Sequence, residues 1–248
     1  MVETKKDYDE TLVEAARSVL LELVHLLSQY RDRIVLVGGW VPDLLIPGDT
    51  THHIGSIDVD LALDHRTLTE AGYHSIMQLL LARGYEQGEQ PFIFFRKVTI
   101  GSRVIRVQVD FLAGEYAGSS KAHRTQRVQD MRPRKARGCD LAFEMPVEVV
   151  LQGTLPNGAR DSVKVRVASI VPFLVMKGFA LGNRLKEKDG YDVYYAITRY
   201  PGGLEALVKA FAPFRLSRLV RESLDIIAEK FASPEHIGPR LVVDFEEI

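Results

Sequence analysis

The apolar positions of the sequence predict helices and strands in turn along its first part. Between residues 9 and 30, apolar side chains recur at the spacing of one helix face, at Leu12, Ala16, Val19, Leu23 and Leu27. Residues 34–37 form an apolar run that stops at Gly38-Gly39, which is typical of a buried strand entering a tight turn. A short helix is predicted over 40–45, and an alternating strand over 57–63.

Two strand pairs follow in the middle of the chain. The pattern predicts a helix over 68–82 that ends at a glycine, and then a β-hairpin of strands 92–98 and 103–112. Strands over 144–155 and 162–168 flank a Pro-Asn-Gly turn signal. Alternating strands beside amphipathic helices indicate a sheet with helices packed on it.

The last part of the chain reads as helical from Ser169 to about residue 231, with breaks near 182–188 and 201–203. The predicted fold class is therefore α+β, with a mixed β-sheet flanked by helices and followed by a helical C-terminal region. We expect three parts: a core with its N-terminal helix, a basic segment with a strand pair, and a helical region that contributes to the active site, at 1–115, 116–168 and 169–248.

Composition adds little that is specific. The 248 residues are 46% hydrophobic and carry a formal net charge of −1, so no overall charge favours a nucleic acid or a membrane as partner. Cys139 is the single cysteine, which excludes an internal disulfide and fits a reducing cytoplasm. Because the sequence starts without an apolar signal region and its apolar runs are short, we expect a cytoplasmic protein with no membrane partner.

Positive charge is concentrated in one place. Residues 121–137 contain seven basic side chains and one acid, Asp130, giving 7 − 1 = +6. Such a stretch is either a solvated surface or a guide for a polyanionic acceptor such as tRNA, and the sequence favours neither. No aromatic residue is interleaved there, which disfavours a stacking platform for single-stranded bases.

Three aspartates carry the clearest chemistry. Asp58 and Asp60 are two residues apart in a predicted strand, so they share a face. In the strand over 103–112, Asp110 lies on the face opposite to the apolar side chains, and it becomes a third carboxylate of the same set if the two strands are neighbours. Carboxylates this close repel one another, and hard oxygen donors suit Mg²⁺, or Mn²⁺ in its place. Three of them can hold two metal ions.

The Gly38-Gly39 turn lies between a strand and a helix, where missing side chains let phosphates approach backbone N–H groups. Ser56, just before the aspartates, offers a hydroxyl to the same phosphates. Each of these signals alone is common in proteins. Their order and spacing together favour one site for metal and phosphate.

Together, Gly38-Gly39-Trp40, Gly55-Ser56-Ile57-Asp58-Val59-Asp60 and Val109-Asp110-Phe111 resemble the core motifs of the DNA polymerase β-like nucleotidyltransferase superfamily. The resemblance covers about residues 34–112. It implies a Mg²⁺-dependent enzyme that transfers a nucleoside monophosphate from an NTP to an acceptor and releases pyrophosphate. It also implies that Asp58, Asp60 and Asp110 are the metal ligands.

A second set, Lys177, Arg184, Lys188-Asp189 and Asp192, resembles the pattern of AbiEii-like toxin nucleotidyltransferases, the group that includes the MenT toxins. Lys177 and Arg184 are seven residues apart, so we expect them on one helix face, where they meet a triphosphate. The resemblance implies that Lys177 binds NTP phosphates and that Asp189 or Asp192 completes the site, without deciding between the two.

Each of these residues also has a structural reading. Lys177 lies among apolar neighbours and, as an amphipathic side chain, can extend its amine to solvent. Asp189 or Asp192 can be a helix N-cap. His52-His53 are assigned no metal, because adjacent side chains in an extended loop diverge. Trp40 is expected to pack in the core.

The leading functional hypothesis is a toxin-type nucleotidyltransferase that modifies RNA, such as a tRNA end, or a protein hydroxyl, and that a cognate antitoxin restrains. One alternative is a small-molecule nucleotidyltransferase of the aminoglycoside-modifying kind, although the basic stretch argues against it. Another is a non-catalytic binding protein with the same fold. A DxD-containing glycosyltransferase needs neither the Gly-Gly turn nor the later aspartate, and a Rossmann dehydrogenase is disfavoured because G-x-G-x-x-G is missing.

Overall fold

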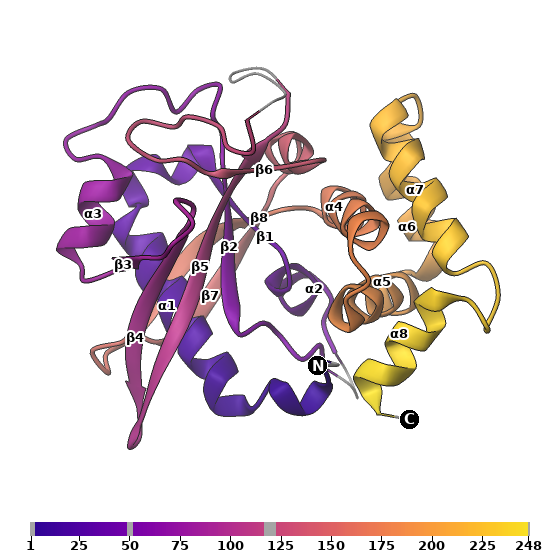
Figure 1. The fold of residues 1–248 in the computed structure, drawn as a ribbon, viewed down its shortest axis with the longest axis horizontal. Helices are drawn as coiled ribbons and strands as arrows, with labels where there is room; N and C mark the ends of the chain where they lie inside the picture. The colour runs from indigo at the N-terminus through magenta and orange to yellow at the C-terminus, as the bar shows by residue number, and fades with distance from the viewer. Residues whose placement is uncertain (1–2, 49–51, 117–122, 248) are drawn as a thin grey trace.

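An eight-stranded mixed sheet forms the centre of the protein (Figure 1). The computed structural model describes residues 3–48, 52–116 and 123–247. In chain order the strands are β1 (Ile34–Val37), β2 (Asp58–Leu63), β3 (Glu86–Gln87), β4 (Ile93–Ile100), β5 (Arg103–Gly114), β6 (Arg134–Ala136), β7 (Val147–Thr154) and β8 (Arg160–Val167). They lie in the order β3-β4-β5-β2-β1-β8-β7, and β6 pairs with β5.

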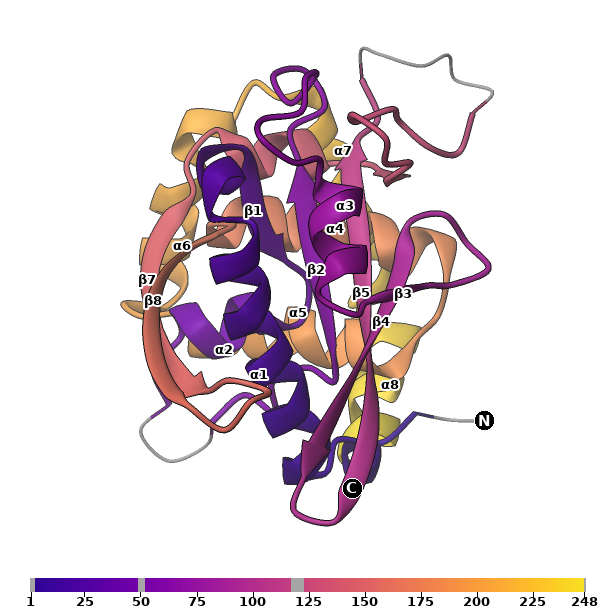
Figure 2. The same ribbon diagram turned by 90° about the vertical axis from the view of Figure 1, so that its left-hand side faces the viewer.

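Helices cover both faces of this sheet. In chain order they are α1 (Glu10–Leu26), α2 (Trp40–Leu45), α3 (Ile76–Ala82), α4 (Ile170–Asn183), α5 (Glu187–Arg199), α6 (Gly203–Phe211), α7 (Arg218–Lys230) and α8 (Ile237–Glu246). Short 3₁₀ helices occupy Lys5–Asp7, Ser28–Arg33, Cys139–Phe143 and Ala212–Phe214. Figure 2 shows α1 and α3 in front of the sheet and the C-terminal helices behind it. The predicted α+β class, with flanking helices and a helical C-terminal region, is confirmed.

The sheet is mixed because its central strands run in both directions. β1 pairs antiparallel with β2 and parallel with β8, whereas β2 pairs parallel with β5. All four residues of β1 are buried, as its unbroken apolar run predicted. The strands of the middle part of the chain, β6 to β8, join the same sheet as those of the first part.

Several predicted elements are confirmed, and two boundaries were wrong. The strand at 34–37, the helix at 40–45 and both strand pairs are present. The predicted helix over 68–82 begins only at Ile76, because Ser75 caps it: its hydroxyl accepts from the backbone N–H of Gln78, whose side chain bonds the N–H of Ser75. The first helix ends at Leu26 rather than near residue 30, and its continuation is a 3₁₀ helix.

No helix in the described part of the chain combines the length and the apolar character needed to cross a membrane.

Candidate active site

Three carboxylates lie on one face of the neighbouring strands β2 and β5. Their parallel register places Asp60 directly opposite Asp110, and Asp58 opposite Gln108. Because residues two apart in a strand share a face, Asp58 lies on the same side of the sheet as the Asp60–Asp110 pair. The adjacency of the two strands, on which the prediction of a third carboxylate depended, is therefore present.

This acidic face is poorly neutralised by the protein. Burial, followed by the charges of Asp58 and Asp110, raises the pKa of Asp60 well above its usual range. Burial also raises the pKa of Asp110, and the hydrogen bond from Gln108 opposes this only partly. Asp110 Oδ2 accepts that bond at 3.0 Å, while its buried Oδ1 has no hydrogen-bond partner. A buried, unpartnered carboxylate oxygen is costly unless a cation compensates it.

The donor set fits a divalent cation, although it is not assembled as a closed cage. Among residues 3–48, 52–116 and 123–247, no group of three or more His, Cys, Asp or Glu side chains already has the arrangement of a metal site. Ser56 Oγ donates to Asp58 Oδ1, and Gln108 occupies Asp110 Oδ2, so two of the three carboxylates are engaged elsewhere. The oxygen-only set, the free Asp110 Oδ1 and the mutual repulsion suit Mg²⁺ or Mn²⁺ held by Asp58, Asp60 and Asp110.

The Gly-Gly turn lies against these carboxylates. Gly38 has a φ of +74°, and a Cβ atom there would lie 2.0 Å from Asp60 Oδ2; at Gly39 it would lie 2.8 Å from Ser56 Oγ. Trp40, the first residue of α2, is buried and donates from its indole N–H to the carbonyl oxygen of Asp58 at 2.8 Å. The expectation that Trp40 packs in the core is confirmed. Its hydrogen bond also fixes the turn to the start of β2.

We expect Gly38→Ala to impair both folding and any reaction at this site. The left-handed backbone conformation disfavours alanine, and the added methyl group must displace Asp60, which together cost about 1–3 kcal/mol of unfolding free energy. Gly158→Ala is the matched control, because Gly158 also has a positive φ, +87°, but a methyl group added there would meet no atom within 4 Å. Chemical denaturation of both variants separates backbone strain from the clash. Equal losses of stability would contradict the close approach to Asp60.

Two cations face the acidic strands from the helical region. Lys177 on α4 lies with its Nζ 2.6 Å from Asp189 Oδ1 and 2.7 Å from Asp192 Oδ2. Burial alone would lower the pKa of Lys177, but the two aspartates outweigh it and raise that pKa. The alternative in which this amine extends to solvent is therefore wrong.

Arg184 also lies beside Asp189, but it is not on a helix face with Lys177 as predicted. α4 ends at Asn183, and Arg184 follows it in an extended conformation. The prediction that Arg184 shares a helix face with Lys177 was therefore wrong. Its Nε instead lies 2.8 Å from Asp189 Oδ2, and Asp189 thereby joins both cations. The N-cap alternative for Asp189 and Asp192 was also wrong, because α5 begins at Glu187 with Lys186 as its N-cap.

The two aspartates differ in position. Asp189 lines the cavity described below, whereas Asp192 is fully buried behind it and contacts Lys188 Nζ through Oδ1. The same Oδ1 lies 2.9 Å from His53 Nε2. Burial, followed by the charge of Lys188, lowers the pKa of His53 to about 4, so its ring is neutral at pH 7. His53 was not a predicted site residue, and its partner lies 139 positions away in the sequence.

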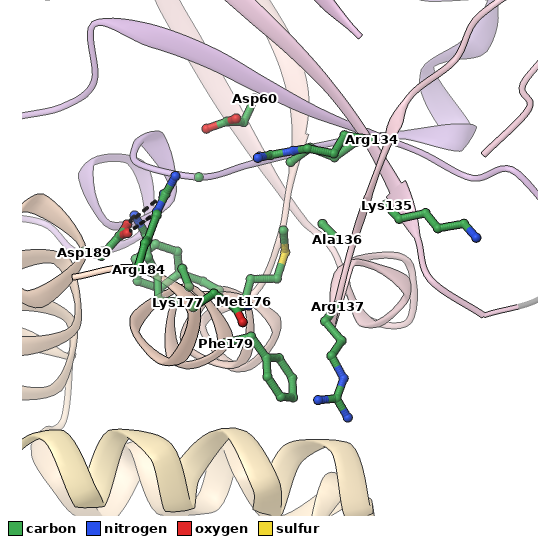
Figure 3. Close-up of a pocket in the computed structure, with 15 residues that line it drawn as sticks. Asp60, Arg134, Lys135, Ala136, Arg137, Met176, Lys177, Phe179, Arg184 and Asp189 are labelled. Carbon is green, nitrogen blue, oxygen red and sulfur yellow. Dashed lines mark hydrogen bonds and ion pairs between the residues drawn. The ribbon is translucent and has the colours of Figure 1, made fainter. Parts of the chain in front are cut away.

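A cavity of about 240 Å³ separates the acidic strands from these cations (Figure 3). Gly38 and Asp60 line one side, and Lys177, Arg184 and Asp189 line another. The basic segment completes the wall, because β6 pairs with β5 and brings Arg134, Lys135 and Arg137 to the cavity. Arg137 is held there by Glu222 of α7, at 2.7 Å. Lys121 lies outside the described residues.

Comparisons with protein-family models, with curated proteins and with solved structures gave no match for this chain. Around this cavity the structure places Asp60 of the acidic face, Gly38 of the Gly-Gly turn and a wall of cations. Gly39, Ser56, Asp58 and Asp110 do not line it. Such a cavity suits a polyphosphate bridged to carboxylates by divalent cations.

Proposed function

We propose that this protein is a Mg²⁺-dependent nucleotidyltransferase that moves a nucleoside monophosphate from an NTP to an acceptor hydroxyl. The observation that carries the proposal is the acidic face of β2 and β5 facing Lys177 and Arg184 across one cavity, beside the Gly38-Gly39 turn. A metal-bridged triphosphate needs carboxylates for the cations and positive side chains for the remaining phosphate charge. Asp60, with Asp58 and Asp110 beside it on the sheet, lines the same cavity as Lys177 and Arg184.

Different residues of the site have different proposed roles. Asp58, Asp60 and Asp110 would hold Mg²⁺, which when bound lowers the charge on the reacting phosphate and favours ionisation of the acceptor hydroxyl. Gly38 and Gly39 leave the backbone open to phosphate oxygens, and Ser56 supplies a hydroxyl. Lys177 and Arg184 would exchange part of their pairing with Asp189 for the triphosphate.

In the reaction the acceptor oxygen attacks the α-phosphorus in line with the leaving group. The bond from that phosphorus to the bridging oxygen breaks, pyrophosphate leaves, and the proton of the hydroxyl passes to a carboxylate of the acidic face.

For the acceptor we propose RNA, such as a tRNA end, or a protein hydroxyl, with the protein acting as a toxin restrained by a cognate antitoxin. Support comes from the resemblance of the Lys177–Asp192 set to AbiEii-like toxins and from the basic residues at the cavity. Arg134 and Lys135 bring positive charge that suits a polyanion to this wall, whereas the charge of Arg137 is balanced by Glu222. A small cationic acceptor such as an aminoglycoside would be repelled by the same wall.

The test is label transfer. Purified protein is incubated with Mg²⁺, each labelled NTP in turn, and total tRNA, cell protein or an aminoglycoside. We expect labelled RNA or protein, and loss of the label with Asp58→Ala or with a chelator. Label that survives Asp58→Ala contradicts the assignment, and label on the aminoglycoside alone supports the small-molecule alternative. Mg²⁺-dependent NTP binding with no transfer to any acceptor would support a non-catalytic binding protein.

A further inference from the structure

His53 connects the two halves of the candidate active site through one side chain. Its Nδ1 accepts a hydrogen bond from the backbone N–H of Gly55 at 3.1 Å, and its Nε2 lies 2.9 Å from Asp192 Oδ1. Gly55 directly precedes Ser56, which bonds Asp58 on the sheet side. Asp192 pairs with Lys177 on the helical side. A chain of covalent and hydrogen-bonded contacts therefore runs from Asp58 on the sheet to Lys177, which is proposed to bind the triphosphate.

The hydrogen bonds fix the tautomer of this ring. A backbone N–H can only donate, so Nδ1 must be unprotonated; in a neutral imidazole the proton is then on Nε2, which donates to Asp192. The ring cannot easily turn, because it is buried, stacks on Tyr191 at 5.4 Å between centroids and meets the edge of Tyr195 at 4.9 Å. Lys188 contacts the same Oδ1 of Asp192, and Lys177 contacts its Oδ2.

We propose that His53 is a positioning residue, whose hydrogen bonds to Gly55 and Asp192 set the separation between the Ser56–Asp58 segment and Lys177. The proposal rests on the proposed function, since it concerns how the two halves of that site are aligned. His53 does not line the cavity and therefore acts through its neighbours. Small misplacements of reacting groups reduce turnover more than they reduce binding, so the effect belongs in kcat.

Asparagine and glutamine distinguish the two hydrogen bonds of this ring. In His53→Asn, the side-chain amide would occupy the position of Nδ1 and keep the acceptor for Gly55 while losing the bond to Asp192. Glutamine is longer, and its N–H reaches the position of Nε2. Glutamine thereby loses the acceptor for Gly55. Because each variant breaks one end of the bridge, we expect both to lower kcat by about 10- to 100-fold, with the KM for NTP changed less than about threefold.

A purely structural role would lower thermal stability without this split. Tyr85→Phe provides the matched control, because it removes a buried hydrogen bond to Glu22, 2.9 Å long, beneath α1 and away from the cavity. We expect it to lower Tm and leave kcat unchanged at a temperature where all variants are folded. A kcat within about threefold of wild type in either His53 variant would overturn the proposal.

Nitrogen-15 NMR of the histidine rings supplies a readout that does not depend on activity. The proposal requires a neutral His53 at pH 7 with its proton on Nε2. A charged ring or the opposite tautomer overturns it even if the enzyme is active. A wild-type protein that transfers no nucleotide instead overturns the proposed function, and with it any role of His53 in that reaction.

Discussion

Asp60→Asn is expected to abolish nucleotide transfer and, at the same time, to stabilise the metal-free protein. Asp60 lies beside Asp58 and Asp110 in the acidic face, and its raised pKa shows that folding disfavours its charged form. When folding raises the pKa of a carboxyl group, the protein loses folding stability as pH rises from the unfolded-state pKa through the folded-state pKa. At pH 7 the charge of such a group is therefore a net cost. Asparagine removes the cost and the metal ligand together.

We expect a loss of transfer of about 10³-fold or more, and a gain of about 1–2 kcal/mol in the free energy of unfolding without metal. Mg²⁺ should raise the Tm of the wild type and not that of the variant, because only the wild type gains a bound cation on folding. Asp225→Asn, at an exposed position of α7 that does not line the cavity, makes the same change in charge and should change neither quantity. A variant that is less stable at every pH, or that still responds to Mg²⁺ like the wild type, would refute this account of the acidic face.

Asp192→Ala is expected to destabilise the protein by about 3–5 kcal/mol, whereas Asp189→Ala should mainly impair the reaction. Asp192 is fully buried, and Lys188, which is 4% exposed, depends on it for its charge; burial already lowers the pKa of that lysine. Without Asp192 the ammonium group must lose its proton or remain unpaired. Lys177 would keep Asp189, so the damage is greatest behind the cavity.

Asp189 is also buried, but its partners differ. It lines the cavity, and one of its partners, Arg184, is half exposed and can be solvated when the pairing is lost. We expect a cost in stability of about 1–2 kcal/mol and a rise in the KM for NTP, because Lys177 and Arg184 lose the carboxylate that holds them together. Urea unfolding and steady-state kinetics on both alanine variants decide the point. If Asp189→Ala is the less stable variant, the two roles are reversed. The resemblance alone could not assign them.

Local patterns predicted the part of the site that local geometry builds. The apolar run at β1, the Gly38-Gly39 stop and the helix at Trp40 are consecutive, so their arrangement follows from the order of residues. Side-chain alternation in β2 and β5 predicted the faces of Asp58, Asp60 and Asp110, but only the pairing of these strands brings the faces together. The Ser75-x-x-Gln78 capping box was visible in the sequence and would have corrected the start of α3.

The remainder depends on contacts between distant segments. Arg184 meets Lys177 through Asp189 rather than along a helix, and no periodicity encodes a meeting through a third side chain. β6 is three residues long and has no alternating pattern, so nothing in the basic segment predicted that Arg134 would join the cavity. A histidine in a loop, such as His53, carries no signal of a buried aspartate that lies far along the chain.

Because β2 and β5 precede α4 and α5 in the chain, the two halves of the site are synthesised one after the other. The carboxylates and the Gly-Gly turn leave the ribosome first, while Lys177, Arg184 and Asp189 follow more than sixty residues after Asp110. Domains fold as their residues emerge, so a nascent chain that ends before α4 has the acidic face without the opposing cations. Such an intermediate lacks Lys177 and Arg184, the cations proposed to bind the triphosphate. On the proposed function, an activity that would harm the cell is thereby withheld until the helical region has been translated.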